Sequence, residues 1–219
     1  MDLTLYQKMI GANNSNITQA YINDTIVHVN DMFSKSPSYR QVLIDGVESD
    51  CIINRKKSHQ LDLLLRPSSL VDAGSYVEMK QNTYIILDFI ENEIYPKANA
   101  SLCNRFLRWK DGKDEIKEYK CFVKGTTYEE NDDTQIVYNS DGELTVQVQY
   151  NNDTKTIKPQ MRFIFDESVY EVSSIDSVSN VYDGKGVLKL VLKFANLTDT
   201  DDKENQIADD SGNSGWGEW

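Results

Sequence analysis

One hairpin-like pattern, present twice with a spacing of 86 residues, constrains the fold of this chain most. In the first copy, Val77 and Met79 alternate with polar residues, Gln81-Asn82 offers turn chemistry, and Thr83–Leu87 is β-branched and aromatic. Adding 86 to each number places YVEMKQNTYIILDF on RFIFDESVYEVSSI without a gap. Two amphipathic hairpins can also look alike by chance, so true repetition stays open. Both interpretations predict two β units.

A third strand is predicted after each hairpin, at residues 101–109 in the first copy and 187–194 in the second. In the first, Cys103, Arg105, Leu107 and Trp109 alternate with their neighbours. The Asp111-Gly112 turn is expected to fold residues 116–123 over this strand. We therefore predict that Trp109 lies in the core of the first unit.

Two helices are predicted before the β region, at residues 3–10 and 17–33. In the second, Ile22, Ile26, Val29 and Phe33 recur at spacings of three and four, which gives one apolar stripe. Such a helix must bury its stripe on the β region or on another chain. These four residues are therefore a candidate assembly surface.

The pattern predicts a mainly β fold with two small antiparallel β-barrel or sandwich units, an N-terminal helical segment and an extended acidic C-terminal arm. About seven short strands precede residue 125, enough for a closed or nearly closed barrel. The polar stretch 125–134 is the predicted linker. The expected parts are a helical segment (1–35), a first β-barrel-like domain (36–125), a second β domain (126–197) and a flexible arm (198–219).

The C-terminal arm differs sharply from the rest in composition. Residues 199–219 contain seven acidic residues and one lysine, and they end in Gly-Trp-Gly-Glu-Trp. A segment this charged is not expected to fold alone. Trp216 and Trp219 are predicted to anchor the arm on another subunit or partner. A free end with incidental aromatic residues is the alternative.

The formal net charge of −12 and the pI near 4.6 argue against a surface dominated by contacts with DNA or anionic membranes. The basic groups Arg55-Lys56-Lys57 and Arg105, Arg108 and Lys110 are interpreted as solvated charge. No apolar run is long enough to cross a bilayer, and the N-terminus shows no secretory pattern. No membrane partner is expected.

The sequence carries no recognisable catalytic motif. His28 and His59 have no Ser or Cys at a signature spacing, and GxSxG, Walker and HExxH patterns do not occur. Cys51, Cys103 and Cys121 lie in strand-like runs and lack zinc-site spacing, so buried free thiols are predicted. We therefore expect no catalytic residue, no metal and no cofactor, and an enzyme is disfavoured.

Several stretches together resemble a known family. These are the hairpin at 74–89, LCNRFLRW at 102–109, MRFIF with YEVSSI at 161–175, and ENQIADD near the end. The chain resembles, over residues 1 to about 210, the neck proteins of tailed bacteriophages that infect Gram-positive bacteria. These are head–tail connector or head-closure proteins. Relatives often carry Trp where this chain has Tyr84.

The resemblance implies a non-enzymatic virion protein, made in the host cytoplasm and located in the neck, at the head–tail interface. Its copies would form a homo-oligomeric ring that joins the portal or adaptor to tail proteins and contacts packaged DNA transiently. The ring lumen is then expected to be acidic or neutral.

Two alternatives remain. One is a tail component, either a tail terminator or a tail-tube-associated protein. The other is a host-surface or carbohydrate-binding β module, in which Tyr128, Tyr138 and Tyr150 would form an aromatic platform.

Overall fold

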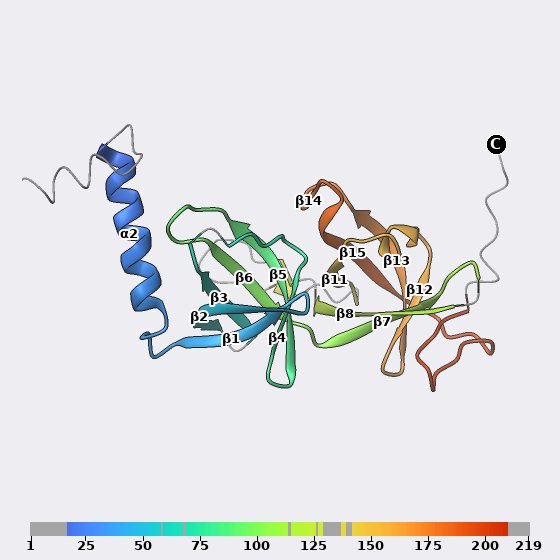
Figure 1. Ribbon diagram of the computed structural model, residues 1–219. Helices are drawn as coiled ribbons and strands as arrows, with labels where there is room; N and C mark the ends of the chain where they lie inside the picture. The colour runs from blue at the N-terminus through green and yellow to red at the C-terminus, as the bar shows by residue number, and fades with distance from the viewer. Residues whose placement is uncertain are drawn as a thin grey trace, which may run out of the picture.

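The described part of the chain forms one helix followed by two β units in a row (Figure 1). Helix α2 (Ile17–Phe33) stands at one end, as predicted. The predicted helix at residues 3–10 lies outside the described residues. A computed structural model of the chain describes residues 17–57, 59–67, 69–113, 115–125, 127–128, 137–138 and 142–209.

The first unit is a closed barrel in which the strand order is β1-β2-β3-β6-β5-β4. Pairing of β1 with β4, with Leu43 opposite Glu78, closes the barrel. Asp45 and Gly46 both have positive φ in the β1–β2 turn, which is the conformation that an Asp-Gly hairpin favours. The strands are β1 (Tyr39–Ile44), β2 (Val47–Lys57), β3 (Gln60–Leu65), β4 (Tyr76–Met79), β5 (Asn82–Ile90) and β6 (Lys97–Leu102).

Alternating side chains of these strands fill the first barrel. Tyr84, where the resembling family often has Trp, is buried in this core. The buried apolar residues are Val42, Ile44, Cys51, Leu61, Leu63, Leu65, Val77, Tyr84, Ile86, Ala98 and Ala100.

The second unit is a seven-stranded sheet with the order β12-β13-β15-β11-β8-β7, and β14 pairs with β15. A separate pair is formed by β9 (Thr127–Tyr128) and β10 (Val137–Tyr138). A short 3₁₀ helix, η1 (Thr154–Thr156), follows β11. The sheet strands are β7 (Arg105–Lys110), β8 (Ile116–Gly125), β11 (Leu144–Gln149), β12 (Arg162–Phe165), β13 (Ser168–Asp176), β14 (Val181–Tyr182) and β15 (Lys185–Ala195).

The six main strands of the two units have the same connectivity. Taken in chain order, β7, β8, β11, β12, β13 and β15 occupy the same places in the second sheet as β1 to β6 occupy in the first. The predicted hairpin correspondence holds in detail. The bounds of β4 and β5 differ from those of β12 and β13 by 86 at every end. Lys80 and Asp166 have φ of 57° and 56° in the two turns. A register shift also recurs, between Ile86 and Asp88 and between Val172 and Ser174.

The predicted third strand at 101–109 is wrong as a single strand, because its two halves belong to different sheets. β6 pairs with β5 in the first barrel, whereas β7 pairs with β8 in the second sheet. The side chain of Asn104 accepts a hydrogen bond from the amide of Val123 at 2.8 Å and donates one to the Val123 carbonyl at 2.9 Å. In a continuous strand, backbone groups would make these two hydrogen bonds. The true counterpart of β15 is therefore β6.

The boundary between the two β domains therefore lies earlier in the chain than predicted. Both β7 and β8 precede residue 126, yet they pair in the second sheet. The first barrel therefore has six strands, not about seven, and the chain changes sheet between Leu102 and Arg105 instead of at residues 125–126.

Trp109 is buried, with 2% of its surface exposed, so its prediction as a core residue is confirmed. It belongs to the second unit, however, because its strand does. Its ring stacks on Tyr119 and meets Phe163 edge-on, with centroids 5.8 and 6.3 Å away. The core around it comprises Leu107, Cys121, Val146, Val148, Ile157, Phe163, Phe165, Val172, Leu188, Leu190 and Leu192.

Candidate interaction surfaces

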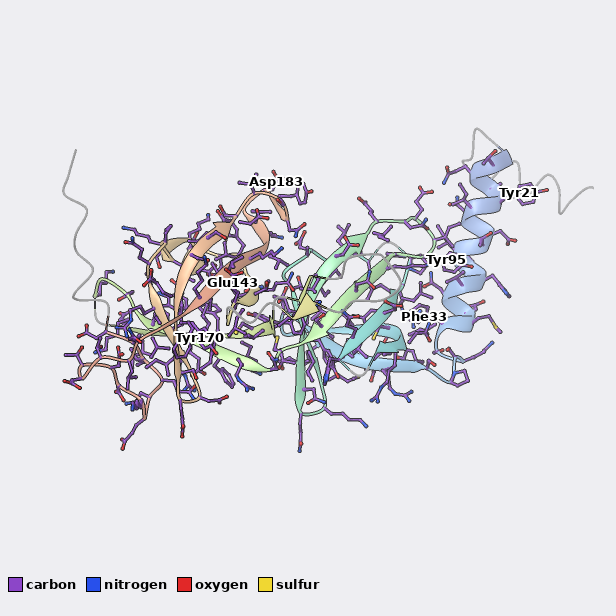
Figure 2. The ribbon with its side chains drawn as sticks, turned by 180° about the vertical axis from the view of Figure 1, so that it is seen from behind. Tyr21, Phe33, Tyr95, Glu143, Tyr170 and Asp183 are labelled. Carbon is purple, nitrogen blue, oxygen red and sulfur yellow. The ribbon has the colours of Figure 1, made fainter. Side chains whose placement is uncertain are left out.

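Helix α2 projects from the first barrel and is anchored there by its last turn (Figures 1 and 2). Phe33, the end of the predicted stripe, is 2% exposed and packs edge-on against Tyr39. The guanidinium of Arg66 lies 4.9 Å from the centre of the Phe33 ring and donates to Asp50 at 2.7 Å and to the Asn30 carbonyl at 3.3 Å. These contacts fix the direction in which the helix leaves the barrel.

The remainder of the predicted stripe is only partly covered. Ile22, Ile26 and Val29 are each half-buried. Three further apolar side chains on α2 are largely exposed, with Tyr21 at 68%, Val27 at 60% and Met32 at 48%. Tyr21 lies near the end of the helix farthest from the barrel, whereas Phe33 lies at its base (Figure 2). Of the four stripe residues, only Phe33 is buried by the barrel.

The C-terminal arm is partly folded against the second unit, which corrects the expectation for residues 198–209. Arg162 donates two hydrogen bonds to the carboxylate of Asp201, at 2.7 and 3.1 Å, and Asp201 is 0% exposed. The amides of Thr198 and Asp209 donate to the same carboxylate at 2.8 and 2.9 Å. Four hydrogen bonds thus close the segment into a loop.

Burial alone raises the pKa of Asp201, but these amide and guanidinium hydrogen bonds outweigh it and lower the pKa to about 2. The loop also has an apolar contact, since Ala208 packs with Ile164 and Val169 on the outer face of the sheet. Acidic composition did not prevent folding here, because Arg162 supplies the countercharge. Trp216 and Trp219 lie outside the described residues.

The two units meet at a close backbone contact. Gly74 has φ +87°, and a Cβ there would lie 1.9 Å from the carbonyl oxygen of Gly186. Next to it, Tyr76 donates to the Lys120 carbonyl at 2.6 Å, and Lys120 Nζ donates to Thr83 Oγ1 at 2.7 Å. Both glycines are visible in the sequence, but no sequence pattern indicates that the two residues are in contact. The units are therefore joined by fixed contacts as well as by chain connectivity.

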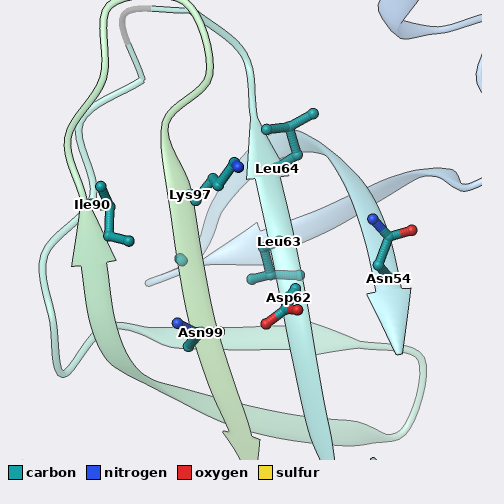
Figure 3. Close-up of a pocket in the computed structure, with 8 residues that line it drawn as sticks. Asn54, Asp62, Leu63, Leu64, Ile90, Lys97 and Asn99 are labelled. Carbon is teal, nitrogen blue, oxygen red and sulfur yellow. The ribbon is translucent and has the colours of Figure 1, made fainter. Parts of the chain in front are cut away.

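Two shallow hollows open on the surface. One, of about 440 Å³, lies on the outer face of the first barrel (Figure 3) and is lined by Asn54, Asp62, Leu63, Leu64, Ile90, Lys97, Ala98 and Asn99. The other, of about 320 Å³, lies beside the joint and is lined by Asp45, Asp72, Ala73, Ser75, Gln149, Tyr150, Asn151, Asn152, Gly184, Lys185 and Gly186. The first is lined about equally by polar and apolar surface and the second mostly by polar surface, and neither gathers groups arranged for chemistry.

Both units match known domain families. The YomX N-terminal domain matches residues 9–101, and the YomX C-terminal domain matches residues 105–193. The chain belongs to the YomX family. This is a phage-like family associated with a Bacillus prophage, so the expected link with phages is confirmed at that level. The two YomX domains meet where the structure changes sheet.

Other comparisons add little to the YomX assignment. No curated protein matches the chain. Among solved structures, YcgR in complex with c-di-GMP from Escherichia coli is similar over 84% of this chain and 87% of that chain, with 11% identity and a TM-score of 0.22. A similarity this weak supports no conclusion about function.

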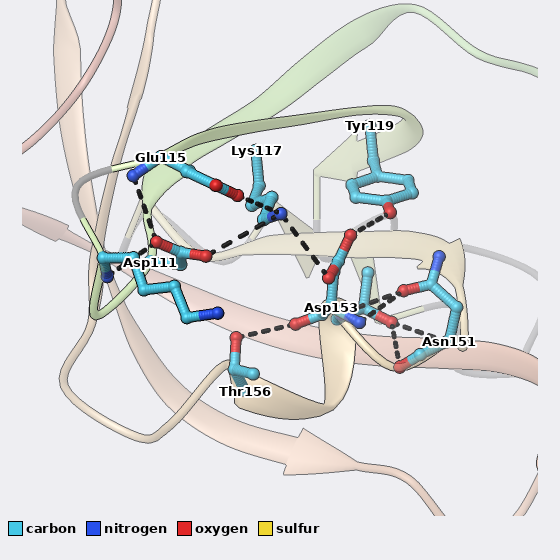
Figure 4. A network of polar contacts seen from close by, with 9 residues as sticks. Asp111, Glu115, Lys117, Tyr119, Asn151, Asp153 and Thr156 are labelled. Atoms are coloured by element: carbon cyan, nitrogen blue, oxygen red, sulfur yellow. Dashed lines mark hydrogen bonds and ion pairs between the residues drawn. The ribbon is translucent and has the colours of Figure 1, made fainter.

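A polar network covers the end of the second YomX unit (Figure 4). Lys117 Nζ lies 3.1 Å from Glu115, 3.7 Å from Asp111 and 3.8 Å from Asp153. Asp153 also accepts from Tyr119 at 2.6 Å. The hydrogen bond to Glu115 raises the pKa of Lys117, which stays protonated as the centre of the group. The network ties the β7–β8 turn to the η1 loop and is structural.

The groups considered for chemistry are dispersed. His28 is exposed on α2, and His59 is exposed before β3. The three cysteines are free, and burial raises the pKa of Cys51 to about 11 and that of Cys103 to about 12, which keeps both protonated at neutral pH. Within the described residues, no cluster of His, Cys, Asp or Glu could hold a metal ion, and no helix could span a membrane.

Proposed function

We propose that this chain is a non-catalytic structural protein of the neck of a tailed phage. Its copies form a ring at the head–tail interface, contact the portal or adaptor and tail proteins, and retain or conduct the packaged DNA. One observation carries the proposal: within the described residues, α2 leaves the barrel with Ile22, Ile26 and Val29 only partly covered and with Tyr21, Val27 and Met32 largely exposed. An apolar helix held out in this way is suited to contact with another protein subunit.

Two further features support a structural role. The family is phage-like, and the close approach of Gly74 to Gly186 with the hydrogen bonds of Tyr76 and Lys120 joins the two units firmly, as suits a ring subunit. The net charge of −12 suits a conduit, because a lumen rich in Lys and Arg would hold the phosphate backbone instead of letting it slide.

The experiment is negative-stain microscopy of the purified protein, alone and mixed with portal rings of the same phage, combined with immunogold labelling of whole particles. We expect rings that stack on portals and label at the neck. Label at the distal tail would favour the tail-component alternative. A monomer that binds host cells or carbohydrate and is missing from particles would overturn the proposal.

A further inference from the structure

Helix α2 presents two apolar surfaces side by side, and their arrangement identifies what covers them. We call Ile22, Ile26 and Val29 the seam, and Tyr21 and Met32 the flank. With about 100° between successive helical residues, the flank lies about 80–100° around the helix from Ile22. The seam is half-buried, whereas the flank is largely exposed.

The charges of α2 lie opposite the seam, and Asp24 is about 60° around the helix from Tyr21 of the flank. Its two acidic residues, Asp24 and Asp31, fall about 160–200° from Ile22, on the opposite side of the helix. The seam follows the four-three spacing of a coiled-coil core, and its immediate neighbours Asn23, Thr25 and Asn30 are neutral. A chain with net charge −12 repels its own copies, so a neutral, apolar contact is where two copies can meet.

From this arrangement we infer that α2 binds α2 of a second copy, with the seam of one copy against the flank of the next. The inference rests on the proposed function and names the subunit contact of the ring. A ring needs two different complementary patches on each subunit. A symmetric pair that joined seam to seam would leave Tyr21 at 68% and Met32 at 48% exposed. The seam-to-flank contact covers both surfaces and repeats around a ring.

The anchorage of α2 favours such a contact. Phe33 and Arg66 fix the helix at its base, and neighbouring copies related by rotation hold their helices nearly parallel when α2 runs along the ring axis. Ile22 of one copy then lies at nearly the same height as Tyr21 of the next. Two heptads are too short for a stable isolated helix pair. The contact therefore depends on presentation by the barrels and on closure of the ring.

Disulfide cross-linking between two single variants tests the geometry. Ile22→Cys and Tyr21→Cys proteins, oxidised together, should give a disulfide-linked dimer that neither gives alone. Wild type reports any background from its own cysteines. Asp31→Cys, opposite the seam and almost three turns along α2 from Tyr21, should cross-link in neither mixture. Linkage of Ile22→Cys with itself would show seam-to-seam pairing and overturn the inference. Oligomers without any α2 linkage would overturn it and leave the neck function standing.

A matched pair of charge variants tests the energetics without oxidation. Ile26→Asp places a carboxylate in the seam and should weaken self-association by about tenfold or more, because burying an unpaired charge is costly. Val27→Asp makes the same change one residue along, on the side of the seam away from the flank, and should leave association unchanged. Sedimentation velocity measures both, with circular dichroism as the folding control. Equal association of the two variants would refute the inference.

Discussion

Trp109 gives the sharpest test of how the second unit is held together. Its indole is 2% exposed, stacks on Tyr119 and meets Phe163 edge-on. Among the described residues its Nε1–H has no hydrogen-bond partner. The side chain therefore contributes through apolar contact alone, while a buried donor left unpaired costs about 1–3 kcal/mol.

Two substitutions test the ring contacts, because both of them remove the unpaired donor. Trp109→Ala removes the whole indole and should lower the free energy of unfolding by about 3–5 kcal/mol, as large-to-small core changes do. Trp109→Phe keeps an aromatic ring between Tyr119 and Phe163 and removes the unpaired donor. The gain of about 1–3 kcal/mol from removing the donor is common to both variants, so phenylalanine should cost less than alanine because it keeps the ring contacts.

Urea denaturation followed by far-ultraviolet circular dichroism measures both values, with the slope checked for two-state behaviour. Equal costs for Phe and Ala would refute the argument that the ring contacts with Tyr119 and Phe163 stabilise this core. An alanine variant that unfolds like wild type but fails to assemble would refute the core assignment itself.

Four further outcomes follow from the structure. Gly74→Ala should destabilise the protein by more than Gly184→Ala in thermal melts. Both glycines have positive φ, which costs alanine about 1–2 kcal/mol, but only a Cβ at Gly74 meets backbone; equal melting temperatures would contradict this. Asp201→Asn should expose the arm to protease by unpairing Arg162, whereas Asp199→Asn, at an exposed position, should not. The pKa of Asp201 is lowered from 3.8 to about 2, so the stability that its carboxylate gives to the arm is present above pH 4 and lost as pH falls through 2. Hydrogen exchange in the arm that does not change with acid would contradict this. Assembled rings should bind DNA weakly even at low salt; tight binding abolished by moderate salt would show a basic lumen. Deleting residues 210–219 should leave the melting temperature unchanged and weaken partner association, and normal tail attachment by the truncated protein would exclude an anchor.

Sequence patterns predicted the local structure well, because hairpins are determined by residues close in the chain. Alternation and turn residues located both repeated hairpins, and the Asp45-Gly46 turn has the expected positive φ. The same local information failed at Cys103-Asn104. Alternation continues through both halves of 101–109, so it cannot reveal that the chain leaves one sheet and enters another.

The stripe of α2 was also predicted correctly, but not what covers it. Whether Ile22 and Ile26 are buried depends on where the helix points, and that is decided by Arg66 contacting Phe33 and Asn30. These contacts join residues more than thirty positions apart. The folded half of the arm was missed for a similar reason. The acidic composition of residues 199–209 predicted a disordered arm, because composition carries no information on the ion pair between Arg162 and Asp201.

The placement of the two ends separates the contacts that a neck subunit needs. α2 stands beyond the first barrel, whereas the folded part of the arm, drawn in red, lies by the second unit at the opposite end of the row (Figure 1). There Arg162 donates to the carbonyl of Asp209, the last described residue, at 3.2 Å. Ten residues follow Asp209 in the sequence, and fully extended they reach at most about 33–36 Å. Trp216 and Trp219 are therefore expected to dock around the second unit, on a different surface from the one that α2 uses. Under the proposed function, the first unit would close the ring, and the second would present the tryptophans to the next component of the neck.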